Sequence, residues 1–215
     1  MKNQSITEAM LQFIEESPTA FHAAANVEAL FLENGFEKLE NLAEGALVPG
    51  GSYYTMQNGS AVLAVKIPEN PAKGFRIAAS HSDSPCFKIK EVPEMKVENT
   101  YVKLNVEKYG GMILSPWLDR PLSVAGRVFV AGKDGKLEAK LVNLKKDLLI
   151  IPNVAIHFNR EINNGFAYNP QTDMAPLMGL DQELSIKKLC AEAAGVDMES
   201  AYTAGNAPAT FQMRQ

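Results

Sequence analysis

Residues 75–85 read FRIAASHSDSP, and the predicted fold rests mainly on this stretch. Its first five residues form a short, mostly apolar run that favours a buried strand, and a polar cluster ending at Pro85 follows. His81 and Asp83 therefore stand where a strand gives way to a loop, which is the edge at which open α/β sheets bind ligands. Residues two apart in an extended chain point the same way, so His81 and Asp83 can face one site together.

An imidazole beside a carboxylate is typical of a metal site, in which the carboxylate is a second ligand or fixes the tautomer of the histidine. The same residues are also typical of a histidine that is hydrogen-bonded at a strand end, beside a turn formed by Asp-Ser-Pro. On these few residues alone, the hydrogen-bonded histidine is the more frequent arrangement.

The composition is that of a soluble globular protein and argues against several partners. The 215 residues carry a formal net charge of −4 without a cluster of Lys and Arg, so we expect no nucleic-acid partner. No apolar run approaches the length of a membrane span, so we expect no membrane partner. Cys86 and Cys190 lie far apart without a CxxC motif, which favours free thiols and a cytoplasmic location.

Periodicity divides the chain into an α/β opening and a β-rich continuation. Helical spacing and an Asn58-Gly59 hairpin signal predict helices and strands before the buried strand, at residues 7–16, 19–34, 52–56 and 61–67. No helical pattern interrupts residues 97–151, whose alternation predicts antiparallel strands. A third helix is predicted at about residues 181–194, and residues 201–215 have no period, which predicts a poorly ordered tail.

Two further stretches carry more Trp, Arg, His and Asn than a plain sheet requires. They are YGG at 109–111 with WLDRP at 117–121, and IPNVAIHFNR at 151–160 with NNG at 163–165. Each stretch alone is typical of a loop rich in turn-forming residues. Their concentration of such residues at segment ends favours an interaction surface.

With these stretches, the sequence resembles the aspartyl-aminopeptidase family, the M18 metallopeptidases, and is similar to its bacterial members. The matching motifs recur in family order over roughly residues 5–199 and include SPTAFH at 17–22, NGS at 58–60, ASHSDSP at 79–85, VEKYGG at 106–111, WLDRPLSVAGRV at 117–128 and IPNVAIH at 151–157. This specific match favours the metal-site interpretation of His81 over the simple hydrogen-bonded one.

The resemblance implies an α/β fold: a zinc-peptidase α/β domain, here incomplete, followed by an inserted β-rich dimerisation domain. The corresponding boundaries are 1–93 for the N-terminal part of the peptidase domain, 94–199 for the dimerisation domain and 200–215 for an irregular tail. Because apolar residues of the incomplete sheet would have too few neighbours, we expect Leu63, Val65 and Ile77 to lack part of their cover.

The resemblance also implies a zinc-dependent aminopeptidase that removes N-terminal residues, preferentially acidic ones, from peptides, and a homo-oligomer built from dimers. By motif position, His81 would be a zinc ligand and Asp83 the catalytic carboxylate behind the metal site. His157 falls on a family histidine that either binds metal or reaches the active site of the neighbouring subunit.

The sequence departs from the family pattern in its metal ligands. The family supplies a bridging aspartate, a Glu-Glu pair, another acidic ligand and a final histidine from a downstream half; here no histidine follows His157, and the only Glu-Glu is Glu15-Glu16. The chain therefore resembles an N-terminal fragment, a truncated gene product or a chain with a frameshifted tail, and it is expected to be inactive in isolation. The alternative is a non-catalytic dimerisation or regulatory chain derived from such a peptidase. A serine hydrolase built from Ser82 or Ser84 with His81 and Asp83 fails, because such triads draw on separate elements.

Overall fold

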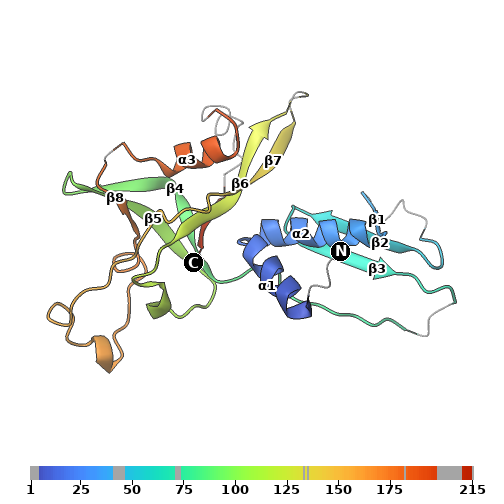
Figure 1. Cartoon of the computed structure of the whole chain (residues 1–215), viewed down its shortest axis with the longest axis horizontal. Coiled ribbons are helices and arrows are strands. Elements are labelled where there is room, and N and C mark those ends of the chain that lie inside the picture. The colour runs from blue at the N-terminus through green and yellow to red at the C-terminus, as the bar shows by residue number, and fades with distance from the viewer. Residues whose placement is uncertain are drawn as a thin grey trace. The chain divides into compact units, whose positions relative to one another are not determined.

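The computed structural model describes residues 5–40, 47–70, 74–132, 134, 136–181, 183–197 and 210–214 (Figure 1). The chain divides into two compact units, Met1–Ser84 and Pro85–Gln215, and each unit has a sheet of its own. Helices and sheets together make a mixed α/β protein, as predicted. Among the described helices, none combines the length and apolar composition that crossing a membrane requires.

Two capped helices open the first unit, close to their predicted positions. Helix α1 spans Ile6–Glu16 and begins at Ser5, whose hydroxyl accepts a hydrogen bond from the Glu8 N–H while the Glu8 carboxylate accepts one from the Ser5 N–H. This reciprocal capping satisfies two backbone donors that a helix start leaves without partners. Helix α2 spans Ala20–Glu33 and is capped in the same position by Thr19.

The sheet of the first unit has three strands in the order β1-β2-β3. Their bounds are Glu37–Lys38 for β1, Ser52–Gln57 for β2 and Ala61–Lys66 for β3. Asn58 and Gly59 join β2 to β3 with φ values of 54° and 68°, the left-handed pair that a tight hairpin requires, so the predicted hairpin is confirmed. Tyr54 of β2 is 1% exposed and packs against Phe31 of α2, with ring centroids 5.7 Å apart.

The predicted strand at residues 75–79 is wrong. The segment runs without strand pairing, and the Phe75 and Ile77 side chains are 89% and 87% exposed. An apolar run becomes a buried strand only when neighbouring strands and helices cover it, and within this unit's described residues β3 pairs only with β2. Leu63 of β3 is also 59% exposed, as the sequence predicts for a partly covered sheet.

The second unit is built on a six-stranded antiparallel sheet in the order β7-β6-β9-β4-β5-β8 (Figure 1). The strands are β4 Cys86–Val97, β5 Tyr101–Tyr109, β6 Ser123–Ala131, β7 Leu137–Asn143, β8 Leu177–Gly179 and β9 Thr210–Arg214. Two short 3-10 helices, Ser115–Trp117 and Ile162–Asn164, lie in its connections. The β-rich character predicted after Pro85 is thus confirmed for the strands β5, β6 and β7.

One core holds this unit together, between the sheet and helix α3 (Ile186–Ala193). The fully buried side chains Phe87, Leu104 and Val128 come from three different strands, and Cys190 comes from α3. Phe87 meets Trp117 edge to face with ring centroids 5.1 Å apart, which ties the loop after β5 to the sheet.

Strand β4 is not predicted by its sequence pattern, because it contains Pro93 among charged residues. The structure accommodates this proline at an irregularity of the ladder, where the pairing register with β5 shifts between Ile89 and Glu94. Glu98 and Asn99, with φ values of 52° and 51°, then turn the chain into β5. The predicted boundary between residues 93 and 94 lies inside this strand.

The prediction of an irregular tail is wrong for Thr210–Arg214, which form β9 in the middle of the sheet, between β6 and β4. Phe211 and Met213 are 5% and 1% exposed and belong to the core. Gly126 of β6 permits this close approach, because a Cβ there would lie 2.8 Å from Phe211 Cα. The predicted tail residues 200–209 and 215 lie outside the described part of the chain.

Candidate functional site

The structure brings His81 and Asp83 together at the end of the first unit. Nδ1 of His81 lies 2.7 Å from the main-chain oxygen of Asp83 and 3.3 Å from its carboxylate Oδ1. The loop that carries them is tied to the β2–β3 hairpin, because the Ser82 hydroxyl donates to the Ser60 carbonyl at 2.9 Å. The His81 side chain is 80% exposed and that of Asp83 42%, so the pair faces solvent within its unit.

This contact determines which nitrogen of the His81 ring carries the proton. A main-chain carbonyl can only accept a hydrogen bond, so the short contact requires the proton on Nδ1. In the neutral imidazole, Nε2 then carries the lone pair, which can bind a metal ion or accept a hydrogen bond. A histidine held at one nitrogen by an acidic residue is the usual arrangement behind a metal ligand.

His22, the remaining histidine of the first unit, has a different surrounding. Its Nδ1 lies 2.9 Å from the Thr19 hydroxyl, and its backbone N–H is the one that Thr19 caps. His22 therefore takes part in the start of α2.

His157 lies in the second unit, within a tight turn of the loop that follows Ile151. The Phe158 N–H donates to the Ala155 carbonyl at 2.8 Å, so residues 155–158 form the turn and His157 is its third residue. The main chain before this turn is fixed by Asp119, whose carboxylate accepts a hydrogen bond from the Asn153 N–H at 2.8 Å. The sequence contains no signal for this contact, since the two residues are 34 positions apart.

A cavity of about 430 Å³ adjoins the same loop. Phe158 and Phe166 line it with Tyr168, and the Phe166 and Tyr168 rings meet edge to face at 5.1 Å. Lys103 and Asp173 supply charged groups of opposite sign to its wall. The sequence predicts an interaction surface on this loop, and it carries no signal for the cavity.

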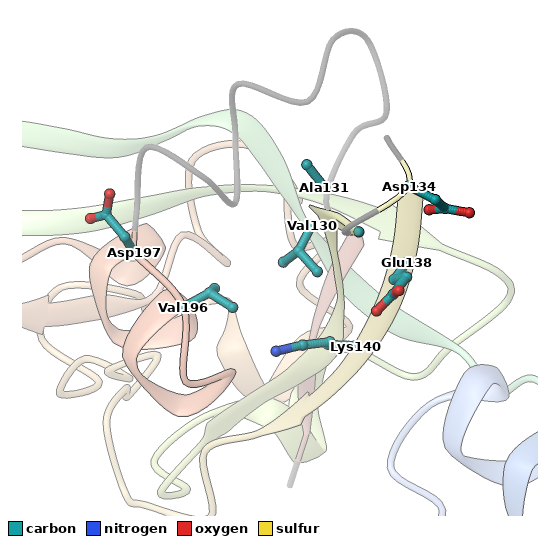
Figure 2. A pocket seen from close by; sticks show the side chains of 8 residues that line it. Val130, Ala131, Asp134, Glu138, Lys140, Val196 and Asp197 are labelled. Carbon is teal, nitrogen blue, oxygen red and sulfur yellow. The ribbon is translucent and has the colours of Figure 1, made fainter. Parts of the chain in front are cut away.

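A second cavity, of about 520 Å³, lies between the β6–β7 hairpin and the segment after α3 (Figure 2). Asp134 and Glu138 stand on the hairpin side and Asp197 across from them, with the Lys140 side chain between. The Lys136 ammonium lies 3.6 Å from the Asp134 carboxylate. The carboxylates therefore stand on opposite walls and do not form a single cation site.

The described residues have donors of the right kind for zinc but too few of them. Zinc favours imidazole nitrogen and carboxylate oxygen, and a protein site has three or four such ligands. Within the described ranges, no three His, Cys, Asp or Glu side chains lie close enough to hold a metal ion together. His81 and Asp83 thus supply at most two of the donors that a zinc site requires.

Comparison with known proteins shows the family to which this chain belongs. Residues 13–201 match the model of the family described as aminopeptidase I zinc metalloprotease (M18). The chain belongs to the M18 family, which confirms the resemblance drawn from its motifs.

Particular relatives support the same assignment. The chain is 43% identical over 209 residues to a probable M18 family aminopeptidase 2 of Clostridium acetobutylicum, a match that covers 93% of this chain and 48% of the relative. Among solved structures, it is similar to that of the Ape4 and Nbr1 complex, with a TM-score of 0.84 and 30% identity over 95% of this chain and 43% of that one. It is also similar to Chaetomium thermophilum mApe1, with a TM-score of 0.82 and 29% identity over 96% and 50% of the two chains. The chain spans about half the length of the curated relatives it matches.

Proposed function

We propose that this chain forms part of a zinc-dependent aminopeptidase that removes N-terminal residues, preferentially acidic ones, from peptides. The observation that carries the proposal is the contact of His81 Nδ1 with Asp83, which leaves Nε2 available, in a chain of the M18 family. The family is described as a zinc metalloprotease, which supports zinc as the metal.

Within this proposal, His81 is a zinc ligand that the chain itself supplies. Asp83 holds the imidazole through Nδ1, so that its tautomer and orientation are set before the metal binds. Zinc in such a site acidifies a bound water and polarises the scissile carbonyl. In this proposal, the remaining zinc ligands correspond to residues in the part of the relatives' sequences that this chain does not match.

The second unit supplies the subunit contact of the proposed enzyme. In this proposal, residues 94–199 form the dimerisation domain of a homo-oligomer built from dimers, while residues 1–93 belong to the peptidase domain. His157 lies at or near the subunit boundary, where its exposed ring can donate to a substrate carbonyl or bind metal. The two buried free cysteines, Cys86 and Cys190, support a reducing, cytoplasmic location.

The second candidate function is a non-catalytic dimerisation or regulatory chain derived from such a peptidase. It is favoured by the incomplete donor set, because His81 and Asp83 are joined by no third metal-binding side chain among the described residues. Such a chain would keep the subunit surface of the second unit and would act by assembling with a complete enzyme.

A chimaera separates the two functions. It consists of the Clostridium acetobutylicum relative in which this chain replaces the matched 209 residues. If the proposal is right, the chimaera hydrolyses N-terminal Asp and Glu substrates with zinc, and His81→Ala abolishes turnover while the control His22→Ala does not. A folded chimaera without zinc-dependent turnover would favour the non-catalytic function.

A further inference from the structure

Asp119 has a backbone conformation that few side chains adopt. Its φ of 57° lies in the left-handed region, in the connection between Trp117 and β6. Asp and Asn tolerate this region better than other residues with a Cβ, yet it still carries an energetic cost. The structure around Asp119 must therefore favour this conformation.

Two hydrogen bonds join Asp119 to the chain on both sides of Pro152. Its backbone N–H donates to the Ile151 carbonyl at 2.9 Å, and its Oδ1 accepts from the Asn153 N–H at 2.8 Å. The neighbouring residues Leu118 and Ile151 form a parallel bridge. A carboxylate acceptor makes the Asn153 bond stronger than a bond between neutral groups.

These contacts lead along the main chain to His157. The Asn153 side-chain oxygen accepts from the Val154 N–H at 2.9 Å, and the turn closed by Ala155 and Phe158 follows at once. Packing contributes little over this segment, because residues 152–158 are all exposed and the Phe158 side chain is 85% exposed. Hydrogen bonds near the start of the loop, rather than a buried core, thus determine where the turn lies.

We propose that Asp119 is a positioning residue for His157, whose carboxylate holds the start of the loop that presents the imidazole. The left-handed backbone of Asp119 aims the carboxylate at the Asn153 N–H while its own N–H holds Ile151. The catalytic consequence of this contact rests on the proposed function, in which His157 acts on substrate or metal. The positioning itself does not depend on turnover.

Substitutions at Asp119 separate the carboxylate from the backbone conformation. Asp119→Asn keeps an oxygen acceptor and a residue that tolerates left-handed φ. Asp119→Gly keeps the conformation without strain but removes the acceptor, and Asp119→Ala removes both. Asp181→Gly is the matched control, because the Asp181 carboxylate also accepts a backbone hydrogen bond, from Glu183 at 2.9 Å, in an exposed turn of the same unit.

The experiment measures amide hydrogen exchange and imidazole NMR signals of the 215-residue chain, which contains three histidines. Asp119→Gly and Asp119→Ala should speed exchange of the Asn153 amide by about tenfold. They should also shift or broaden the His157 signal, whereas the His22 and His81 signals stay unchanged. Asp119→Asn, which keeps an oxygen acceptor without its charge, should change both readouts less than Asp119→Gly does, and Asp181→Gly should change neither.

Three results would overturn the proposal. The Asn153 amide and the His157 signal could be unchanged in Asp119→Gly, or Asp119→Asn could perturb them as much as Asp119→Gly does. Loss of amide protection in β6 of Asp119→Gly would show that the carboxylate supports the whole unit and not the loop. None of these readouts involves substrate. A failure of the positioning proposal can therefore be distinguished from a failure of the proposed peptidase activity.

Discussion

The Tyr54 hydroxyl donates a hydrogen bond of 3.0 Å to Glu28 Oε1, and the same oxygen lies 2.9 Å from the Lys38 ammonium. This contact joins helix α2 to strands β1 and β2. The Lys38 hydrogen bond is the main cause that lowers the pKa of Glu28 below 4.5, and it raises the pKa of Lys38 above 10.5. Burial, together with the bond to Glu28, raises the pKa of Tyr54.

Glu28→Gln should therefore reduce the stability of the first unit in a pH-dependent manner. We expect a loss of about 1 kcal/mol in the free energy of unfolding at pH 7, since the ion pair is partly exposed. Because the pKa of Glu28 is lower in the folded state, ionised Glu28 stabilises that state fully at pH values above its unfolded pKa of 4.5. The stabilisation is lost as the pH falls through the lower folded pKa. The raised pKa of Lys38 stabilises the folded state fully below the unfolded value of 10.5. This stabilisation is lost as the pH rises through the higher folded value.

Urea unfolding at several pH values checks this prediction. The difference between wild type and Glu28→Gln should be full between pH 5 and 10 and should shrink below about pH 4.5. Glu33→Gln, on the exposed side of the same helix, is the control and should show no such pattern. A difference that persists unchanged at pH 3 would contradict the charge-based explanation.

Strand β9 should be essential to the second unit. Phe211→Ala removes a core side chain that is 5% exposed, and we expect it to lower the free energy of unfolding by about 3–5 kcal/mol. Phe158→Ala removes the same groups from a side chain that is 85% exposed and should change stability by less than about 0.5 kcal/mol. Denaturant unfolding of both variants measures the contrast, and equal effects would show that β9 does not complete the sheet.

The Cys190 thiol should be unreactive in the folded protein. Its side chain is fully buried in α3, and burial raises the pKa of Cys190 to about 12. Because the thiolate is the reactive form, iodoacetamide at pH 8 should modify folded Cys190 at least about 100-fold more slowly than in the urea-unfolded chain. Mass spectrometry of proteolytic peptides distinguishes modified Cys190 from modified Cys86, with an exposed Ser115→Cys variant as the reactive control. Rapid modification of folded Cys190 would contradict its place in the core.

The apolar segment after β3 should contribute little to stability within this chain. Phe75 and Ile77 are 89% and 87% exposed, so the double change to serine should alter the free energy of unfolding by less than about 0.5 kcal/mol. It should also reduce self-association and dye binding by exposed apolar surface, measured by light scattering and ANS fluorescence. A loss of more than about 2 kcal/mol would show that the segment is a buried strand, as its sequence predicts.

Local signals predicted those parts of the fold that depend on neighbouring residues. Helix α2 followed from the helical spacing of its apolar residues, and the first hairpin followed from Asn58 and Gly59, because both patterns lie within neighbouring residues. Strand β4 was missed because Pro93 is tolerated only where the ladder with β5 is irregular. Periodicity in β4 alone carries no information on that partner.

Parts that depend on distant partners could not be predicted in this way. The apolar run at 75–79 looks like a strand, but its pairing depends on elements that its own sequence does not specify. Residues 210–214 look irregular, yet they pair between two strands of the second unit. Within the candidate site, the motif predicted that His81 and Asp83 can share one site, whereas the hydrogen bond from Asn153 to Asp119 requires the folded connection.

Under the proposed function, His157 of one subunit acts at the active site that holds His81 of the neighbouring subunit. In the chimaera, His81→Ala and His157→Ala should each lose most turnover while folding and dimerisation are retained, because each removes an exposed polar group and no core. Unfolding of either variant would contradict that expectation.

The most direct measurement mixes these two inactive variants, lets their subunits exchange and assays zinc-dependent hydrolysis of an N-terminal Asp substrate. If His157 acts across the interface, each mixed dimer holds one site with both wild-type histidines, and about a quarter of wild-type turnover should return. A mixture of His81→Ala with the double variant is the control and should recover nothing. No recovery in the first mixture, despite demonstrated subunit exchange, would show that His157 does not act at the active site of the neighbouring subunit.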